Sequence, residues 1–103
     1  MDIEWIRQKV AADDYEFSDH AEEERQVDRI PISEVEHALL GGCILENYPD
    51  DPRGPSCLVL GYARLGYPIH AVCGKTRGES LRLITLYLPT LPKWLDERTR
   101  ARR

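Results

Sequence analysis

The chain has 103 residues, of which 42% are hydrophobic and 31% charged, and its formal net charge at pH 7 is −4. This length and composition predict one globular domain over residues 1–103 that can bury a modest core. No apolar run is long enough to cross a bilayer, and acids stand where a signal peptide has its basic region. We therefore expect a cytoplasmic protein without a membrane segment. Its three cysteines, Cys43, Cys57 and Cys73, are expected to be free thiols.

Charge is divided unevenly along the chain. Residues 1–74 carry 6 Lys and Arg against 15 Asp and Glu, whereas residues 75–103 carry 8 against 3. The basic part is suited to contact phosphates. Its cations are Lys75, Arg77, Arg82, Lys93, Arg98, Arg100, Arg102 and Arg103. The alternative for the last six residues is a solvated tail that keeps the protein soluble.

Hydrophobic periodicity predicts a first helix over residues 3–12. Three apolar residues have helical spacing there: Ile3, Ile6 and Val10. Asp2 is the expected N-cap, and Asp13 and Asp14 are the expected polar stop. The following segment, residues 15–17, is too short to assign by itself.

Two more helices are predicted before residue 43. One begins at residues 18–20, where Asp19 and Glu22 have the spacing of a capping box, and it contains few apolar residues. The other follows Pro31, with Ser33 and Glu36 as a second capping box and glycines at 41 and 42 as its end. Its expected buried stripe consists of Val35, Leu39 and Leu40.

The period of apolar residues changes to about 2 from Cys43 onward, which indicates strands. Residues 43–48 and 81–87 are predicted strands, and residues 49–55 are a loop by composition. Between them, two apolar runs joined across Gly66 predict a β-hairpin.

A three-residue loop, with Gly66 in the left-handed conformation, is the favoured geometry for this hairpin. It would set Cys57 opposite Cys73, Val59 opposite Ala71 and His70 opposite Leu60. A two-residue loop would instead place the two cysteines on opposite faces.

The order of elements predicts an α+β fold, with N-terminal helices on one face of an antiparallel sheet of about four strands. The expected parts are a helical part at 1–42, a sheet at 43–88 and a basic tail at 93–103.

Four side chains are candidates for chemistry. His20, at a helix start, is either a surface residue that helps a cap or a general acid or base beside Arg25 or Arg29. His70, in mid-strand, is interpreted mainly as a hydrogen-bonded core histidine. Tyr87 and Trp94 either stack on the bases of single-stranded RNA or cover the edge of the core.

A zinc site formed by Cys57, His70 and Cys73 is a weaker hypothesis. It would need a fourth ligand, and strand alternation sends residues 70 and 73 to opposite faces. The cysteines are therefore interpreted as small apolar core residues, with no metal or cofactor.

Four segments carry a resemblance to a known family: SDHAEEERQVDRIPISEVEHALLGG, ILENYPDDPRGPSCLVLG, YPIHAVCG and LITLYLPTLPKW. Together they resemble, over about residues 17–95, the prokaryotic domain-of-unknown-function family numbered four-two-five-eight. Members are often encoded next to a YgiT-type zinc-finger protein similar to the MqsA antitoxin. The resemblance thus implies kinship with the MqsR and RelE toxins, small ribonucleases of the barnase, EndoU, colicin and RelE fold.

The resemblance implies His20, His70 and Tyr87 as site residues. The family's arginine usually follows the first histidine by one helical turn, but Arg25 is one place late, a shift of about 100° around the helix. In a ribonuclease of this type, a base takes the proton of the ribose 2′-OH and an acid protonates the leaving 5′ oxygen. His20 or His70 would be base or acid, and Tyr87 would orient or stack. Arg25, Lys75 or Arg82 would hold the phosphate, without any cofactor.

The partners implied are RNA or the ribosome and a YgiT/MqsA-type antitoxin. The sequence pI of about 5.3 favours a second hypothesis, a non-catalytic module whose acidic front binds a basic partner, with the hairpin edge or the helices as a homodimer or complex interface. Convergence of the two histidines and Tyr87 in one cleft would favour the enzyme.

Overall fold

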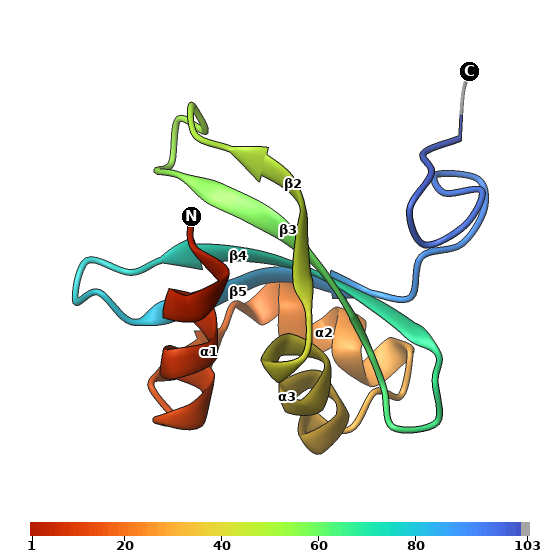
Figure 1. The fold of residues 1–103 in the computed structure, drawn as a ribbon, viewed down its shortest axis with the longest axis horizontal. Helices are drawn as coiled ribbons and strands as arrows, with labels where there is room; N and C mark the ends of the chain where they lie inside the picture. Colours follow the sequence, from red (N-terminus) through yellow and green to blue (C-terminus); the bar gives the residue numbers. More distant parts are fainter. Residues whose placement is uncertain (102–103) are drawn as a thin grey trace.

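The structure, a computed structural model, describes residues 1–101 and has the α+β architecture expected from the sequence (Figure 1). Its helices are α1 (Ile3–Ala11), α2 (Asp19–Val27) and α3 (Ile32–Leu40). Its strands are β1 (Tyr15–Phe17), β2 (Cys43–Tyr48), β3 (Ser56–Tyr62), β4 (Pro68–Lys75) and β5 (Leu81–Tyr87). None of the helices in residues 1–101 is long and apolar enough to span a membrane.

The sheet has five strands in the order β1-β5-β4-β3-β2, one more than predicted. The additional strand is β1, which pairs in parallel with β5, whereas all other pairs are antiparallel. A three-residue strand is too short to show alternation, and its partner lies at the far end of the chain. Residues 15–17, which could not be assigned from the sequence within the helical part at 1–42, are therefore a strand.

The hairpin of β3 and β4 has the predicted three-residue loop. Cys57 pairs with Cys73, Val59 with Ala71, and Leu60 with His70. Gly66 has φ +94°, a conformation that glycine adopts without steric cost. The register fixes two faces, with both cysteines on one and His70 on the other.

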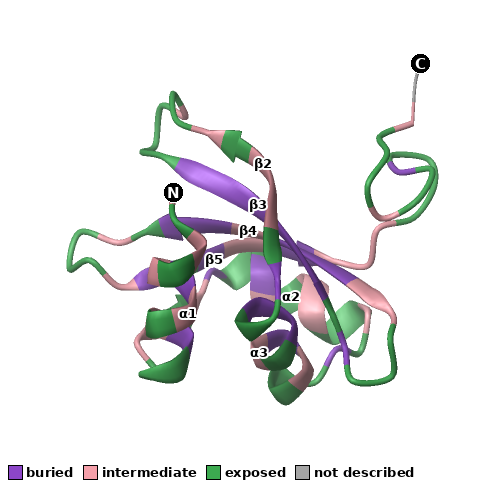
Figure 2. Ribbon diagram, viewed as in Figure 1, coloured by how far each residue is buried: buried purple, intermediate pink, exposed green. Residues whose placement is uncertain are grey.

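The three helices lie together on the face of the sheet that carries Cys57 and Cys73 (Figure 1). Buried residues are concentrated in the central strands and the inner sides of the helices (Figure 2). Helix α3 approaches β3 so closely that Ala38 is buried against Gly61, while Leu40 is 44% exposed. The predicted stripe of α3 was thus correct for Val35 and Leu39 and wrong for Leu40, whose place Ala38 takes.

The helix caps differ from the two predicted capping boxes. Asp2 caps α1 as predicted, but the N-cap of α2 is Ser18 rather than Asp19, and Ser18 Oγ accepts the Ala21 N–H. Helix α3 begins after Pro31 without a side-chain cap, so the predicted Ser33 cap was wrong. Ser18 rather than Asp19 caps α2 because the Ser18 hydroxyl also donates to the Ile84 carbonyl on β5, at 2.8 Å.

Helix α2 is attached to the edge of β5 beyond the end of β1. The Leu86 N–H donates to Glu24 at 3.0 Å, and the Leu88 N–H donates to Asp28 at 3.1 Å. These bonds satisfy backbone donors that would otherwise be unpaired at a sheet edge. They fix the middle and C-terminal end of α2, while the Ser18 bond to Ile84 fixes the N-terminal end, which carries His20, at the rim of the sheet.

Candidate functional site

The site is built on the sheet face opposite the helices, here called the open face. Strand alternation places on it the paired residues Leu60 and His70, together with Tyr87 of β5. The C-terminal segment, residues 89–101, lies on this side of the sheet and is here called the strap (Figure 1).

A groove of about 700 Å³ crosses the open face between the start of α2 and the β2–β3 loop. It is lined by Ser18, His20, Tyr48, Asp51, Arg53, Gly54, Pro55, Ser56, Val72, Gly74, Lys75, Arg82, Ile84 and Thr85. A second depression of about 610 Å³ continues toward the strap. Its lining is His20, Glu24, Asp28, Tyr48, Val72, Thr85, Tyr87, Leu88, Thr90, Leu91, Pro92, Lys93, Trp94 and Arg100. Because four residues line both, we treat them as one feature, the open-face groove.

The first part of the groove is cationic although the chain is acidic overall. Arg53, Lys75 and Arg82 line it against one carboxylate, Asp51. Arg82 forms an ion pair with Glu16, and the Lys75 Nζ lies 3.7 Å from Glu79. Both pairs are substantially exposed, so they are weak and the cations are available to an anionic ligand.

His20 is the accessible histidine of the groove. Its side chain is 67% exposed, and Nε2 lies 3.2 Å from Glu24 Oε1, one helical turn along α2. The position near the N-terminus of α2 follows from the Ser18 cap. An exposed imidazole beside a carboxylate can accept or donate a proton at a bound substrate.

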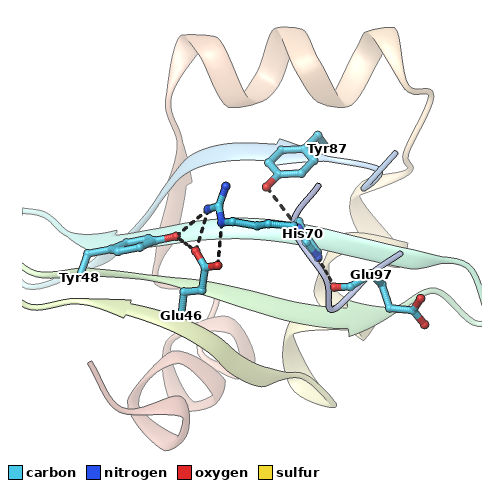
Figure 3. Close-up of polar contacts among 6 residues, drawn as sticks. Glu46, Tyr48, His70, Tyr87 and Glu97 are labelled. Carbon is cyan, nitrogen blue, oxygen red and sulfur yellow. Dashed lines mark hydrogen bonds and ion pairs between the residues drawn. The ribbon is translucent and has the colours of Figure 1, made fainter. Parts of the chain in front are cut away.

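His70 is fully buried beneath Tyr87 and the strap. Its Nε2 lies 2.8 Å from the Glu97 carbonyl oxygen, and its Nδ1 lies 3.2 Å from the Tyr87 hydroxyl (Figure 3). A carbonyl only accepts, so Nε2 carries the proton, and in the neutral ring Nδ1 accepts from the Tyr87 O–H. Burial lowers the pKa of His70 and so favours this neutral form.

Tyr87 connects His70 to the groove. Its ring centroid is 5.3 Å from that of His70 with an interplanar angle of 65°, and its side chain lines the part of the groove next to the strap. Burial raises the pKa of the phenol, so Tyr87 stays protonated at neutral pH. Its fixed hydroxyl and partly exposed ring can orient a ligand.

Two other predicted site residues are not part of the groove lining. Arg25 donates to Glu22 at 2.6 and 2.7 Å and to the Ile30 carbonyl at 3.0 Å, and these bonds hold the end of α2. Arg77 is exposed in the turn between β4 and β5. The structure therefore gathers His20, Tyr87, Lys75 and Arg82 along one groove, with His70 below it.

The prediction from sequence missed Arg53, Tyr48 and the pair of Glu46 with Arg100. Arg100 donates to both oxygens of Glu46, at 2.7 and 2.8 Å, which lowers the pKa of that carboxyl. A carboxylate inside the apolar strand 43–48 was the available signal, since such a residue needs a partner. Nothing local in the sequence identifies Arg100 as that partner.

Part of the C-terminal tail contacts the sheet through the strap. Trp94 is 2% exposed and covers His70, with ring centroids 4.5 Å apart, and Arg100 lies over the Trp94 ring at 4.6 Å. The segment is therefore anchored to the sheet through Trp94, although most of its other side chains, Arg98 and Arg100 among them, are exposed. Arg102 and Arg103 of the predicted basic tail lie outside the described residues.

The three residues of the zinc hypothesis are not brought together. Cys57 and Cys73 face the helices, whereas His70 faces the strap. Within residues 1–101, no group of three or more His, Cys, Asp or Glu side chains is arranged to hold a metal ion. Both buried cysteines belong to the apolar core.

Fold and site together define an α+β domain with one sheet face closed by helices and a cationic groove on the other. The chain belongs to the family described as Domain of unknown function (DUF4258), whose model matches residues 17–88. The match contains His20, His70 and Tyr87 and ends before the strap. No curated protein and no solved structure matches the chain. The resemblance to MqsR- and RelE-type toxins remains a prediction.

Proposed function

We propose that the protein is a metal-independent endoribonuclease of the toxin–antitoxin type that binds single-stranded RNA in the open-face groove. The observation that supports it most directly is the charge of this groove. In a chain of net charge −4, the groove lining holds three cations and one carboxylate beside an exposed histidine. Each cation forms an ion pair that is exposed or partly exposed, with Asp51, Glu79 or Glu16. Phosphates bind to such clusters, and the aromatic rings of Tyr48 and Tyr87 offer surfaces on which bases stack.

The chemistry needs only a base, an acid and a cationic site, because RNA supplies its own nucleophile. His20 takes the proton of the ribose 2′-OH, whose oxygen attacks the adjacent phosphorus. Lys75 and Arg82 stabilise the negative charge that develops on the phosphoryl oxygens. The bond to the 5′ oxygen breaks, and that oxygen receives a proton from water, to which His20 returns the proton that it accepted. The products are a 2′,3′-cyclic phosphate and a 5′-hydroxyl end.

The proposed inhibitor is a zinc-finger antitoxin of the YgiT/MqsA type. An inhibitor that covers the groove has to meet its cations and the acidic side of α2 together. The carboxylates Asp19 and Glu23 are exposed on α2 near His20. A partner with a basic surface beside an acidic segment would complement both regions.

Expression in a bacterial host tests the proposal. Wild type is induced beside His20→Ala and Arg82→Gln, with growth and total RNA followed together. We expect growth arrest and RNA cleavage by the wild type, a loss of about 10²–10⁴-fold in rate for His20→Ala, and a smaller loss for Arg82→Gln. Arg77→Gln is the matched control, because it removes the same charge outside the groove and should cleave normally.

Intact RNA and normal growth at good expression of the folded wild type would refute the ribonuclease. The protein-binding alternative would then be pursued by copurification. Cleavage that His20→Ala leaves unchanged would refute the assignment of the base.

A further inference from the structure

The strap covers His70, a fully buried polar side chain of the open face. The imidazole of His70 is capped by the Trp94 indole, and its Nε2–H is used by the Glu97 carbonyl. On the family segment, which ends at residue 88, this histidine belongs to the open face. Residues 89–101 therefore withdraw from the groove a side chain that the rest of the fold presents to it.

The strap is a separate unit in its hydrogen bonding. Within it, the Leu95 N–H donates to the Thr99 carbonyl and the Ala101 N–H donates to the Lys93 carbonyl, both at 2.8 Å. Through residue 101, each hydrogen bond between the strap and the rest of the chain involves a side chain. The strap is not a strand of the sheet, so its departure breaks no ladder hydrogen bond of β2, β3, β4 or β5.

Polar contacts to four side chains of the sheet hold the strap to the open face, one of them from Arg100 to the Tyr48 hydroxyl at 3.4 Å. Glu97 accepts from His70 through its carbonyl and from Tyr62 through its carboxylate, the latter at 3.2 Å. Arg100 pairs with Glu46, and the two side chains are 55% and 28% exposed. Exposed ion pairs of this kind contribute little and weaken with salt. Most of the holding energy must therefore come from burial of the Trp94 indole.

The contacts that the strap makes with the open face resemble those that a bound nucleotide would make. The Trp94 indole is a bicyclic aromatic ring, about the size of a purine base, that meets the His70 imidazole edge to face, with an interplanar angle of 89°. The Glu97 carbonyl oxygen accepts from His70 Nε2–H, as a phosphate oxygen would. Arg100 belongs to the strap, so its pair with Glu46 is broken when the strap opens.

We propose that the strap is an autoinhibitory cover that single-stranded RNA displaces, with a base taking the slot of Trp94 and a phosphate oxygen taking the hydrogen bond of Glu97. This inference rests on the proposed function, because it concerns regulation of the same groove. It assigns His70 a role in the open state, where its Nε2–H reaches the RNA backbone. It also gives the closed state an incomplete site, with His20 and Tyr87 accessible and His70 withheld.

The test uses Trp94 as its own reporter. Trp5→Phe removes the other tryptophan, and the full chain is titrated with a non-cleavable 2′-O-methyl RNA 12-mer of mixed sequence. We expect the emission of Trp94 to shift to the red and its quenching by acrylamide to rise as the oligonucleotide saturates. Glu46→Gln in the same background should make Trp94 more accessible before RNA is added and tighten binding by about two- to five-fold. Glu4→Gln, the same charge change on α1, is the matched control and should do neither.

Each outcome separates the two proposals. Oligonucleotide binding with Trp94 still protected overturns the strap mechanism and leaves the ribonuclease standing. Trp94 exposure on binding, without cleavage of the corresponding unmodified RNA, supports the strap and refutes the nuclease. Failure of both the wild type and Glu46→Gln to bind the 12-mer overturns both proposals.

Discussion

Replacement of Gly61 by alanine tests the packing on which the fold depends. A Cβ added at Gly61 would lie 2.5 Å from the carbonyl carbon of Ala38 and 2.9 Å from its Cα, and closer still to its carbonyl oxygen. Carbon atoms in contact are separated by about 3.5–4.0 Å, so α3 would have to move away from β3 by about 1 Å. The atoms that clash are backbone atoms, so no side-chain rotation relieves them.

The cost follows from what α3 buries. Val35, Ala38 and Leu39 are buried, and a gap of about 1 Å removes roughly a quarter to a half of each dispersion contact. With full burial of a Val or Leu side chain worth about 1.5–3 kcal/mol, we expect Gly61→Ala to lose about 2–3 kcal/mol of unfolding free energy. The midpoint of thermal unfolding should fall by roughly 10–20 °C.

Urea denaturation followed by far-UV circular dichroism measures this loss. Gly41→Ala is the matched control, because the nearest atom to its Cβ, the His37 carbonyl oxygen, is 3.8 Å away and its φ is negative. We expect the control to change stability by less than about 0.5 kcal/mol. The double variant Ala38→Gly with Gly61→Ala should stay destabilised, since glycine keeps the clashing backbone. A cost below about 1 kcal/mol for Gly61→Ala, or rescue by Ala38→Gly, would refute the packing argument.

Two further predictions concern the cap of α2 and the buried histidine. Ser18→Ala should lower the unfolding free energy, measured by urea denaturation, by about 1–2 kcal/mol, because it removes the cap of the Ala21 N–H and leaves the Ile84 carbonyl without its donor. Asp19→Ala should lower it by less than about 0.5 kcal/mol. A larger loss for Asp19→Ala than for Ser18→Ala would contradict the cap assignment. Burial lowers the pKa of His70, and the bond to Glu97 offsets part of this shift. In the unfolded chain histidines titrate near pH 6.5. The folded protein therefore binds fewer protons than the unfolded chain as the pH falls below that value. The contribution of His70 to stability is therefore complete above about pH 6.5 and decreases as pH falls from there through the folded pKa, so His70→Gln should show a shallower fall in unfolding free energy between about pH 7 and 5. Equal slopes for the two proteins would show that His70 is not buried in its neutral form.

The environment of His70 shows how far the site could be anticipated. The hairpin loop, and with it the pairing of His70 with Leu60, followed from the position of Gly66, so the core-like character of this histidine was predictable. Its two hydrogen-bond partners were not, because the pairing of His70 with Tyr87 depends on a β4–β5 register that a bulge shifts, and Glu97 lies in a segment without periodicity. The accessible imidazole of His20 and the cations of β4 and β5 were candidates from sequence. Their arrangement along one groove depends on the attachment of α2 to β5.

The sequence by itself determined the elements whose interactions are local. Helix α1, strands β2 and β5, and the register of the β3–β4 hairpin follow from periodicity and turn chemistry within a few neighbouring residues. The tertiary structure decided whatever depended on distant partners: the parallel pairing of β1 with β5, the choice of Ser18 as cap, and the burial of Ala38 in place of Leu40. The position of the strap over His70 also depends on distant partners. A short polar or irregular segment has little intrinsic preference, so its conformation is set by the surface that it contacts.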